Sequence, residues 1–204
     1  MSKYTNCILF LLLTLTKAYG QETKKIDIRE AASFEVNENR FPDAKILRSN
    51  KDIRVHLHHD GMDIWSDIAY FYETQNFFKA KGNVVVLQGD SLQLNSEYIE
   101  YNGTTKFAVA KLKVHLKNQG STLRTDSLYF DRKKQEAYYN ILGEITSEET
   151  VIRSQSGTYF ADDNKYEFIT NVHVTDPSFT IHSERMDYYT ELRHAYFYGA
   201  TTIN

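Results

Sequence analysis

The feature that most constrains this chain is a short motif that recurs about every 29 residues. A serine or threonine, followed in most copies by an acidic residue, heads each copy. These hydroxyl residues are spaced by 30, 29, 29 and 29 residues and stand at Ser66, Ser96, Thr125, Ser154 and Ser183. A repeat of this length indicates similar supersecondary units that stack and share one core.

Apolar residues hold fixed positions relative to that hydroxyl residue. The step from two residues before it to three residues after it is odd, whereas one face of a straight strand keeps even spacing. We therefore predict a bulge or bend beside each hydroxyl residue, which brings both positions to one core. The positions expected to face the core are Ile64, Leu94, Leu123, Ile152 and Ile181 two before, Ile99 and Leu128 three after, and Phe71, Tyr101, Phe130, Tyr159 and Tyr188 five after.

Local sequence favours β-hairpins throughout. The stretch from Gly82 to Tyr101 is typical of a strand, a two-residue turn at Gly89-Asp90 and a second strand. No segment after Gly20 has the 3.6-residue apolar period of a helix. We predict an all-β fold of stacked antiparallel units.

The first twenty residues are typical of a signal peptide. Lys3 supplies a basic start, an apolar run extends from Cys7 to Thr16, and small residues precede a cleavage site after Gly20. We therefore expect a signal peptide at residues 1–20, one domain at residues 21–204, and export to a periplasm-like space. The only cysteine, Cys7, lies in the expected signal peptide, so no disulfide is expected in the mature chain.

Charge and motifs exclude several function classes. The formal net charge is −3 and no basic stripe is present, which argues against a nucleic-acid partner. The chain has no phosphate-binding glycine loop, nucleophile elbow or paired-cysteine motif, so we expect no enzyme activity and no cofactor.

The remaining polar clusters are interpreted as structural. The acids after the hydroxyl residues, such as Asp67 and Glu97, are expected to support the bulges rather than catalysis. Histidines at His56, His115 and His173 share one repeat position, with His58 and His59 near the first. We interpret them as exposed strand residues and predict no metal site. The charged runs at 132–134 and 162–164 are interpreted as solvated turns.

The repeats resemble the OstA/LptA family of periplasmic lipopolysaccharide-transport proteins. The run Gly82-Asn83-Val84 with Val86, Gln88 and Gly89 is similar to that family's repeat, as are Leu92, Leu94, Ser96, Glu97 and Tyr101 after it. The opening Ile26-x-Ile28-x-Glu30-Ala31 is also similar, and the tyrosine-rich repeats resemble the Bacteroidetes-type members best. The resemblance covers about 26–203, with a hydroxyl-acid corner where the family more often has alanine-aspartate.

The resemblance implies a repetitive antiparallel β-jellyroll with an open, V-shaped groove. In such proteins the inner apolar faces shield the acyl chains of lipid A. The positions expected to face the core, which we call the apolar columns, are therefore candidate lipid-groove residues. Partners implied are lipopolysaccharide, the inner-membrane exporter, the outer-membrane translocon and further copies joined head to tail. The periodicity alone favours a packed core without lipid, as in a structural or carbohydrate-interacting β-solenoid, and it is the resemblance that favours the lipid groove.

The C-terminal segment is a candidate docking edge. No proline or lysine lies between Ala195 and Asn204, although natural β proteins commonly protect an edge with such residues. We expect this edge to accept a similar jellyroll by strand addition. The edge residues expected are Ala195, Phe197, Tyr198, Thr201 and Ile203.

Overall fold

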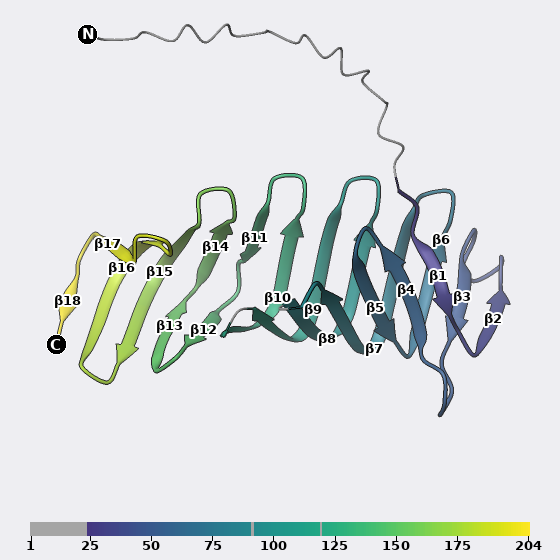
Figure 1. Cartoon of the computed structure of the whole chain (residues 1–204), viewed down its shortest axis with the longest axis horizontal. Helices are drawn as coiled ribbons and strands as arrows, with labels where there is room; N and C mark the ends of the chain where they lie inside the picture. The colour runs from purple at the N-terminus through teal and green to yellow at the C-terminus, as the bar shows by residue number, and fades with distance from the viewer. Residues whose placement is uncertain (1–23, 91, 119) are drawn as a thin grey trace, which may run out of the picture.

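The computed structural model describes residues 24–90, 92–118 and 120–204, and the expected signal peptide lies outside them. The described residues form antiparallel strands stacked along the long axis, and no helix (Figure 1). The strands are β1 (Asp27–Glu30), β2 (Ser33–Val36), β3 (Lys45–Arg48), β4 (Val55–His59), β5 (Met62–Ser66), β6 (Ile68–Tyr72), β7 (Phe77–Gln88), β8 (Leu92–Asn102), β9 (Phe107–Asn118), β10 (Ser121–Asp131), β11 (Glu136–Tyr139), β12 (Gly143–Ser147), β13 (Thr150–Ser154), β14 (Ser156–Phe160), β15 (Lys165–Asp176), β16 (Phe179–Tyr189), β17 (His194–Tyr198) and β18 (Thr202–Ile203). The prediction of an all-β, repetitive antiparallel β-jellyroll is confirmed.

The sheet has two layers because its long strands bend midway. One half of β7 pairs with β6 and the other half with β5. In the same way β10 pairs with β11 and β12, and β16 pairs with β17 and β18. We call the layer containing β2, β3, β6, β11, β14 and β17 the first layer. The layer containing β1, β4, β5, β12, β13 and β18 is the second layer, and the apolar columns lie between the two.

The predicted bulges lie at the bends. Strand register shifts between Thr125 and Ser127 in the β9–β10 pair, and the neighbouring long pairs have equivalent shifts. At each bend a hydroxyl lies within hydrogen-bond distance of the carbonyl two residues later, a local contact between side chain and backbone that supports the irregular geometry. The donors and distances are Ser66 at 3.2 Å, Ser96 at 3.1 Å, Thr125 at 3.4 Å, Ser154 at 2.8 Å and Ser183 at 3.0 Å.

The expected two-residue turn at Gly89-Asp90 is wrong. Gln88 pairs with Leu92, which leaves three residues between the strands. The other second-layer turns leave two, as between Ser147 and Thr150. Val86 and Leu94 both face the core and pair directly, and their even separation requires an odd loop. This extra residue accounts for the single 30-residue spacing in the repeat.

Candidate functional site

The interior between the layers is divided into two parts. A closed core fills the N-terminal part, where side chains from Ile26 to Tyr139 form one buried cluster. A second, smaller cluster surrounds Phe168, Val172 and Met186 in the C-terminal part. Two structural features produce this division: a polar network that joins the layers along one side, and a tyrosine at the boundary.

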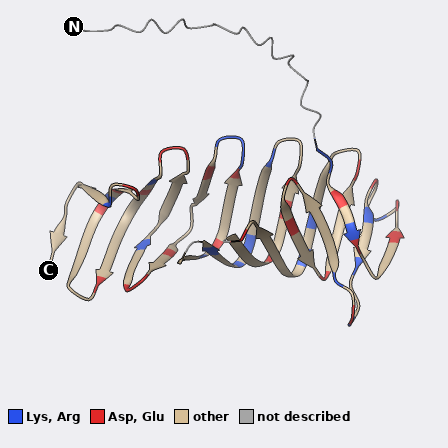
Figure 2. Ribbon diagram, viewed as in Figure 1, with Lys and Arg blue, Asp and Glu red and all other residues tan. Residues whose placement is uncertain are grey.

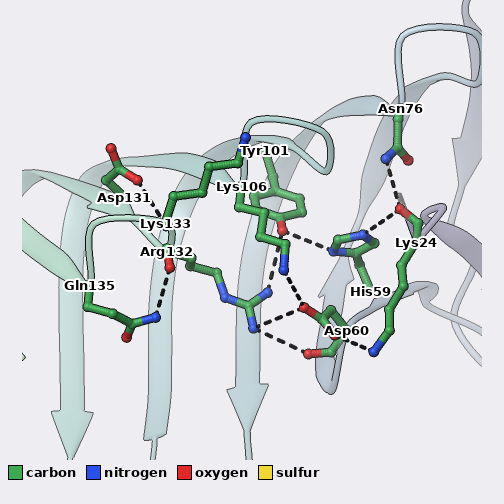
Figure 3. A network of polar contacts seen from close by, with 10 residues as sticks. All are labelled: Lys24, His59, Asp60, Asn76, Tyr101, Lys106, Asp131, Arg132, Lys133 and Gln135. Carbon is green, nitrogen blue, oxygen red and sulfur yellow. Dashed lines mark hydrogen bonds and ion pairs between the residues drawn. The ribbon is translucent and has the colours of Figure 1, made fainter. Parts of the chain in front are cut away.

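The polar network, which we call the seam network, consists of Lys24, His59, Asp60, Asn76, Tyr101, Lys106 and Arg132 (Figure 3). Asp60 lies in the β4–β5 turn of the second layer, whereas Lys106 and Arg132 lie in first-layer turns. The Asp60 carboxylate contacts Lys24 Nζ at 2.6 Å, Lys106 Nζ at 3.1 Å and Arg132 Nη2 at 3.8 Å. Hydrogen bonds from Lys24 and Lys106 hold the pKa of Asp60 well below its usual range. The network therefore ties the two layers together over the closed core.

His59 is the buried member of this network, and its interpretation as an exposed strand histidine is wrong. Its side chain is 1% exposed. Nε2 donates to the Lys24 carbonyl at 2.9 Å, and Nδ1 accepts from the Tyr101 hydroxyl at 2.9 Å. Burial lowers the pKa of His59, and the nearby cations Arg132 and Lys106 act in the same direction. The arrangement thus holds a neutral imidazole between the layers.

The lowered pKa of His59 predicts that the protein loses stability in mild acid. The unfolded chain binds a proton at His59 near its ordinary pKa, whereas the folded chain resists protonation until a lower pH. Stability should therefore be complete above about pH 6.5 and fall as pH decreases toward the folded pKa. Between about pH 7.5 and about pH 5.5, the wild type should lose on the order of 1 kcal/mol more than His59→Gln. Urea unfolding at both pH values tests this, and parallel losses in the two proteins would contradict it.

Arg132 also differs from its expected solvated-turn role. Its side chain is 13% exposed, and its guanidinium donates to the Asp60 carbonyl at 3.3 Å and to the Tyr101 hydroxyl at 3.4 Å. No local sequence pattern indicates this contact, because Asp60 and Arg132 are 72 residues apart.

Tyr139 occupies the boundary between the two clusters. Its ring lies where a Cβ at Gly143 or Gly157 would be, and a Cβ on Gly157 would approach the ring carbon Cζ at 2.6 Å. Its hydroxyl hydrogen-bonds with Ser154 Oγ at 2.7 Å, and burial raises its pKa to about 12. Both glycines stand at positions where the other copies have a larger residue, so one large side chain replaces two smaller ones.

Beyond Tyr139 lies an open cavity of about 590 Å³, which we call the C-terminal cavity. Its walls are mainly aliphatic and aromatic, with hydroxyls and two charged residues at its margin. Its volume is in the range of protein pockets that hold drug-sized ligands. The lining residues are Ser121, Ile145, Ser147, Glu148, Thr150, Ile152, Tyr166, Phe168, Val174, Phe179, Ile181, Met186, Tyr188, Arg193, Ala195 and Phe197.

The candidate groove residues divide between these two environments. Ile152, Ile181 and Tyr188 line the C-terminal cavity. Tyr159 lines an adjoining hollow of about 160 Å³, which shares Ser121, Ile145 and Tyr166 with the cavity and also has Leu123 in its wall. The closed core contains Ile64, Leu94, Ile99, Leu123, Leu128, Phe71 and Tyr101, with Phe130 packed against it.

The candidate edge residues also have different surroundings. Ala195 and Phe197 line the C-terminal cavity, so the cavity extends to the last strands. Tyr198 and Ile203 are exposed, at 45% and 65%. The Thr201 hydroxyl lies 3.0 Å from Ser183 Oγ, at the last bend.

Several cavity residues were missed as site residues by sequence reasoning. Tyr166, Phe168 and Met186 occupy repeat positions whose apolar character was visible, but nothing distinguished an open position from a packed one. Within the described residues there is no cluster of three or more metal-ligating side chains, and none of their segments is a helix long and apolar enough to cross a membrane.

Comparison with known proteins gives the family. No curated protein matches the chain. Among solved structures, LptH from Pseudomonas aeruginosa, described as the LptA-homologous periplasmic component of a lipopolysaccharide transport device, is 19% identical, with a TM-score of 0.32 over 68% of this chain and 82% of LptH. The TCP10 domain of Danio rerio CPAP (E1021V mutant) is 10% identical, with a TM-score of 0.14 over 72% of this chain and 94% of that domain. The family described as OstA-like protein matches residues 23–184, and the chain therefore belongs to the OstA-like family.

Proposed function

We propose that this chain is a non-enzymatic periplasmic carrier of lipopolysaccharide, which holds acyl chains in the C-terminal cavity. The observation that carries the proposal is the open apolar cavity in a member of the OstA-like family. A packed core would leave no such space. Acyl chains would remove the exposed surface of Phe179 and Phe197 from water. This burial would stabilise the bound state by about 25 cal/mol for each Å² of apolar area buried.

The closed core restricts this function to the C-terminal part. Leu57 and Phe78 are fully buried there by neighbouring side chains, and the seam network joins the layers beside them. That part alone fits the alternative of a structural β repeat without lipid. The cavity favours the carrier, because its apolar walls lack partners within the described chain.

The two ends of the stack support a bridging role between membranes. Apolar residues are exposed at both, with Phe34 and Val36 on β2 and Tyr196 and Ile203 at the other end. Exposed apolar residues on edge strands are suited to strand addition by a similar domain. The partners in this proposal are the inner-membrane exporter, the outer-membrane translocon and further copies of this chain.

Photo-crosslinking in cells tests the lipid site. Ile181 and Leu94 occupy the same repeat position and are almost equally exposed, at 8% and 9%, but only Ile181 lines the cavity. A photo-reactive residue at Ile181 should form an adduct with lipopolysaccharide, at a yield at least about ten times that at Leu94, because burial in the closed core excludes the lipid. Equal yields, or adducts with protein alone while export proceeds, would contradict the proposal.

A further inference from the structure

The C-terminal cavity and the hollow beside it share part of their walls. Both are lined by Ile145, Tyr166 and Ser121. Ile145 lies on β12 in the second layer, and Tyr166 lies in the half of β15 that pairs with β14 of the first layer. A side chain from each layer therefore stands between the cavity of about 590 Å³ and the hollow of about 160 Å³. We call Ile145 and Tyr166 the partition.

Neighbouring aromatic rings hold the tyrosine of the partition in place. The centroid of the Tyr166 ring lies 4.5 Å from that of Tyr159. It lies 5.7 Å from that of Phe168, and these two rings are stacked at an angle of 6°. Burial raises the pKa of Tyr166 to about 12, and the nearby Tyr159 and Tyr188 act in the same direction. The first-layer half of the partition is therefore a packed, uncharged wall.

Ile145 is the aliphatic half of the partition and lies where the closed core ends. Its side chain packs against the buried cluster of the closed core and also against the cluster around Phe168. Leu123, its partner on β10, belongs to the closed core and lines the hollow together with Leu116. The Ile145 side chain thus separates the cavity from a space that continues toward the closed core.

The charged groups of the cavity lie at its margin. Among the described residues that line it, the charged ones are Glu148 in the β12–β13 turn and Arg193 in the β16–β17 turn. Figure 2 shows the first of these turns in red, at the edge of the stack. The walls between the turns are mainly aliphatic and aromatic. Such walls discriminate between ligands by the space that they leave for hydrocarbon.

We propose that Ile145 limits the length of the acyl chain that the C-terminal cavity accepts. The inference rests on the proposed lipid site and specifies which chains fit it. An acyl chain that runs between the layers toward the closed core ends at the partition. Because neighbouring rings hold Tyr166, the size of the side chain at position 145 sets the depth of the cavity. A longer chain leaves its additional methylenes outside the apolar walls, where they add no affinity.

Competition binding with alkyl maltosides of increasing chain length tests the proposal. Each maltoside, below its micellar concentration, displaces a fluorescent fatty acid from the mature chain. For the wild type, affinity should rise about fourfold with each added methylene and stop rising at a limiting length. Ile145→Ala should increase that limiting length by about two or three methylenes, because it joins the cavity to the hollow.

Ile152→Ala is the matched control. Ile152 is the cross-strand partner of Ile145; it lines the cavity and is not among the residues that line the hollow. The same truncation there widens the cavity without opening the partition, so it should weaken binding of all maltosides by a similar factor and keep the limiting length. Circular dichroism and urea unfolding check that both variants are folded. Ile145→Val and Ile152→Val make the same comparison with a milder truncation, and the expected difference is about one methylene.

The maltoside series separates the length inference from the lipid site itself. Unchanged limiting lengths in the Ile145 variants, or an equal shift in the Ile152 variants, overturn the inference and leave the lipid site intact. Wild-type affinity that rises through the whole series also overturns it, because the partition would then not stop the chain. If neither the fluorescent fatty acid nor any maltoside binds, the proposed lipid site fails as well.

Discussion

Replacing Tyr139 with alanine is expected to lower the free energy of unfolding by about 3–5 kcal/mol, the usual range for removing a large buried aromatic side chain. The ring is 4% exposed and fills the space beside two glycines, so neighbouring backbone has no side chain that could move into the cavity left behind. The hydrogen bond to Ser154 is lost as well. Urea unfolding at neutral pH measures the change.

The repeat itself supplies the rescue. The positions of Tyr139, Gly143 and Gly157 are occupied in the preceding copy by Ala110, Val114 and Leu128. The triple variant Tyr139→Ala/Gly143→Val/Gly157→Leu should therefore recover most of the lost stability, because three ordinary side chains would fill the volume of the tyrosine. Neither glycine has a positive φ, so the backbone accepts both substitutions.

The single variant Gly157→Leu is the matched control. With Tyr139 present, the new side chain would meet the ring, and overpacking of this kind costs about 1–3 kcal/mol. The losses caused by Tyr139→Ala and by Gly157→Leu should therefore cancel in part when the changes are combined. The coupling in the free energy of unfolding should be about 2 kcal/mol or more. Additive losses across the single and triple variants would show that Tyr139 does not fill the glycine positions.

The columns were predictable because they depend only on spacing within one repeat. Ile64, Leu94 and Ile181 face the interior as expected, and the bends lie where the odd spacing requires them. Position within a repeat, however, does not indicate whether side chains of the opposite layer pack against a residue. Leu94 and Ile181 have the same sequence context but different surroundings.

What separates those surroundings was not predictable from local pattern. The contact between Asp60 and Arg132 joins turns of different layers, and each turn by itself is typical of solvated loops. His59 follows half-buried His58 in sequence, yet it is fully buried because the segment at Lys24 passes over it. Gly143 and Gly157 were signals of a large neighbour, but the sequence did not indicate that Tyr139 fills both spaces.

A double proline variant of the C-terminal edge, Ala195→Pro/Ile203→Pro, is expected to weaken docking of a partner strand about 100-fold. The reason lies in which amides point outward. Thr180 and Asn204 exchange both backbone hydrogen bonds, so the Asn204 amide points toward β16. Because successive residues of a strand direct their amides to opposite sides, the Ile203 amide points away from β16. On β16, the Thr190 amide points toward Asn164, and strict alternation then places the Ala195 amide on the outer side of β17.

Each proline should therefore remove a donor that a partner would use, without breaking the ladder with β16. Two lost hydrogen bonds at about 1 kcal/mol each, with the bulk of the rings, correspond to about two orders of magnitude in affinity. Among the described strands, β16 is the only one with a pairing register to β17 or β18, so the upstream repeats should stay folded. A proline at Tyr198 is a poorer test, because alternation directs its amide toward β16.

The matched control is Ala195→Val/Ile203→Val, which keeps both amides and has at both positions a β-branched residue of the kind favoured in strands. Sedimentation velocity of the mature chain measures head-to-tail association, and co-purification of the outer-membrane translocon from cells measures the other proposed contact. The proline variant should lose one or both, and the valine variant should retain them. Circular dichroism and urea unfolding establish that each variant is folded. If folded proline variants keep both interactions at wild-type strength, strand addition at this edge is not how the chain docks, and the exposed apolar residues of β2 become the remaining candidate edge.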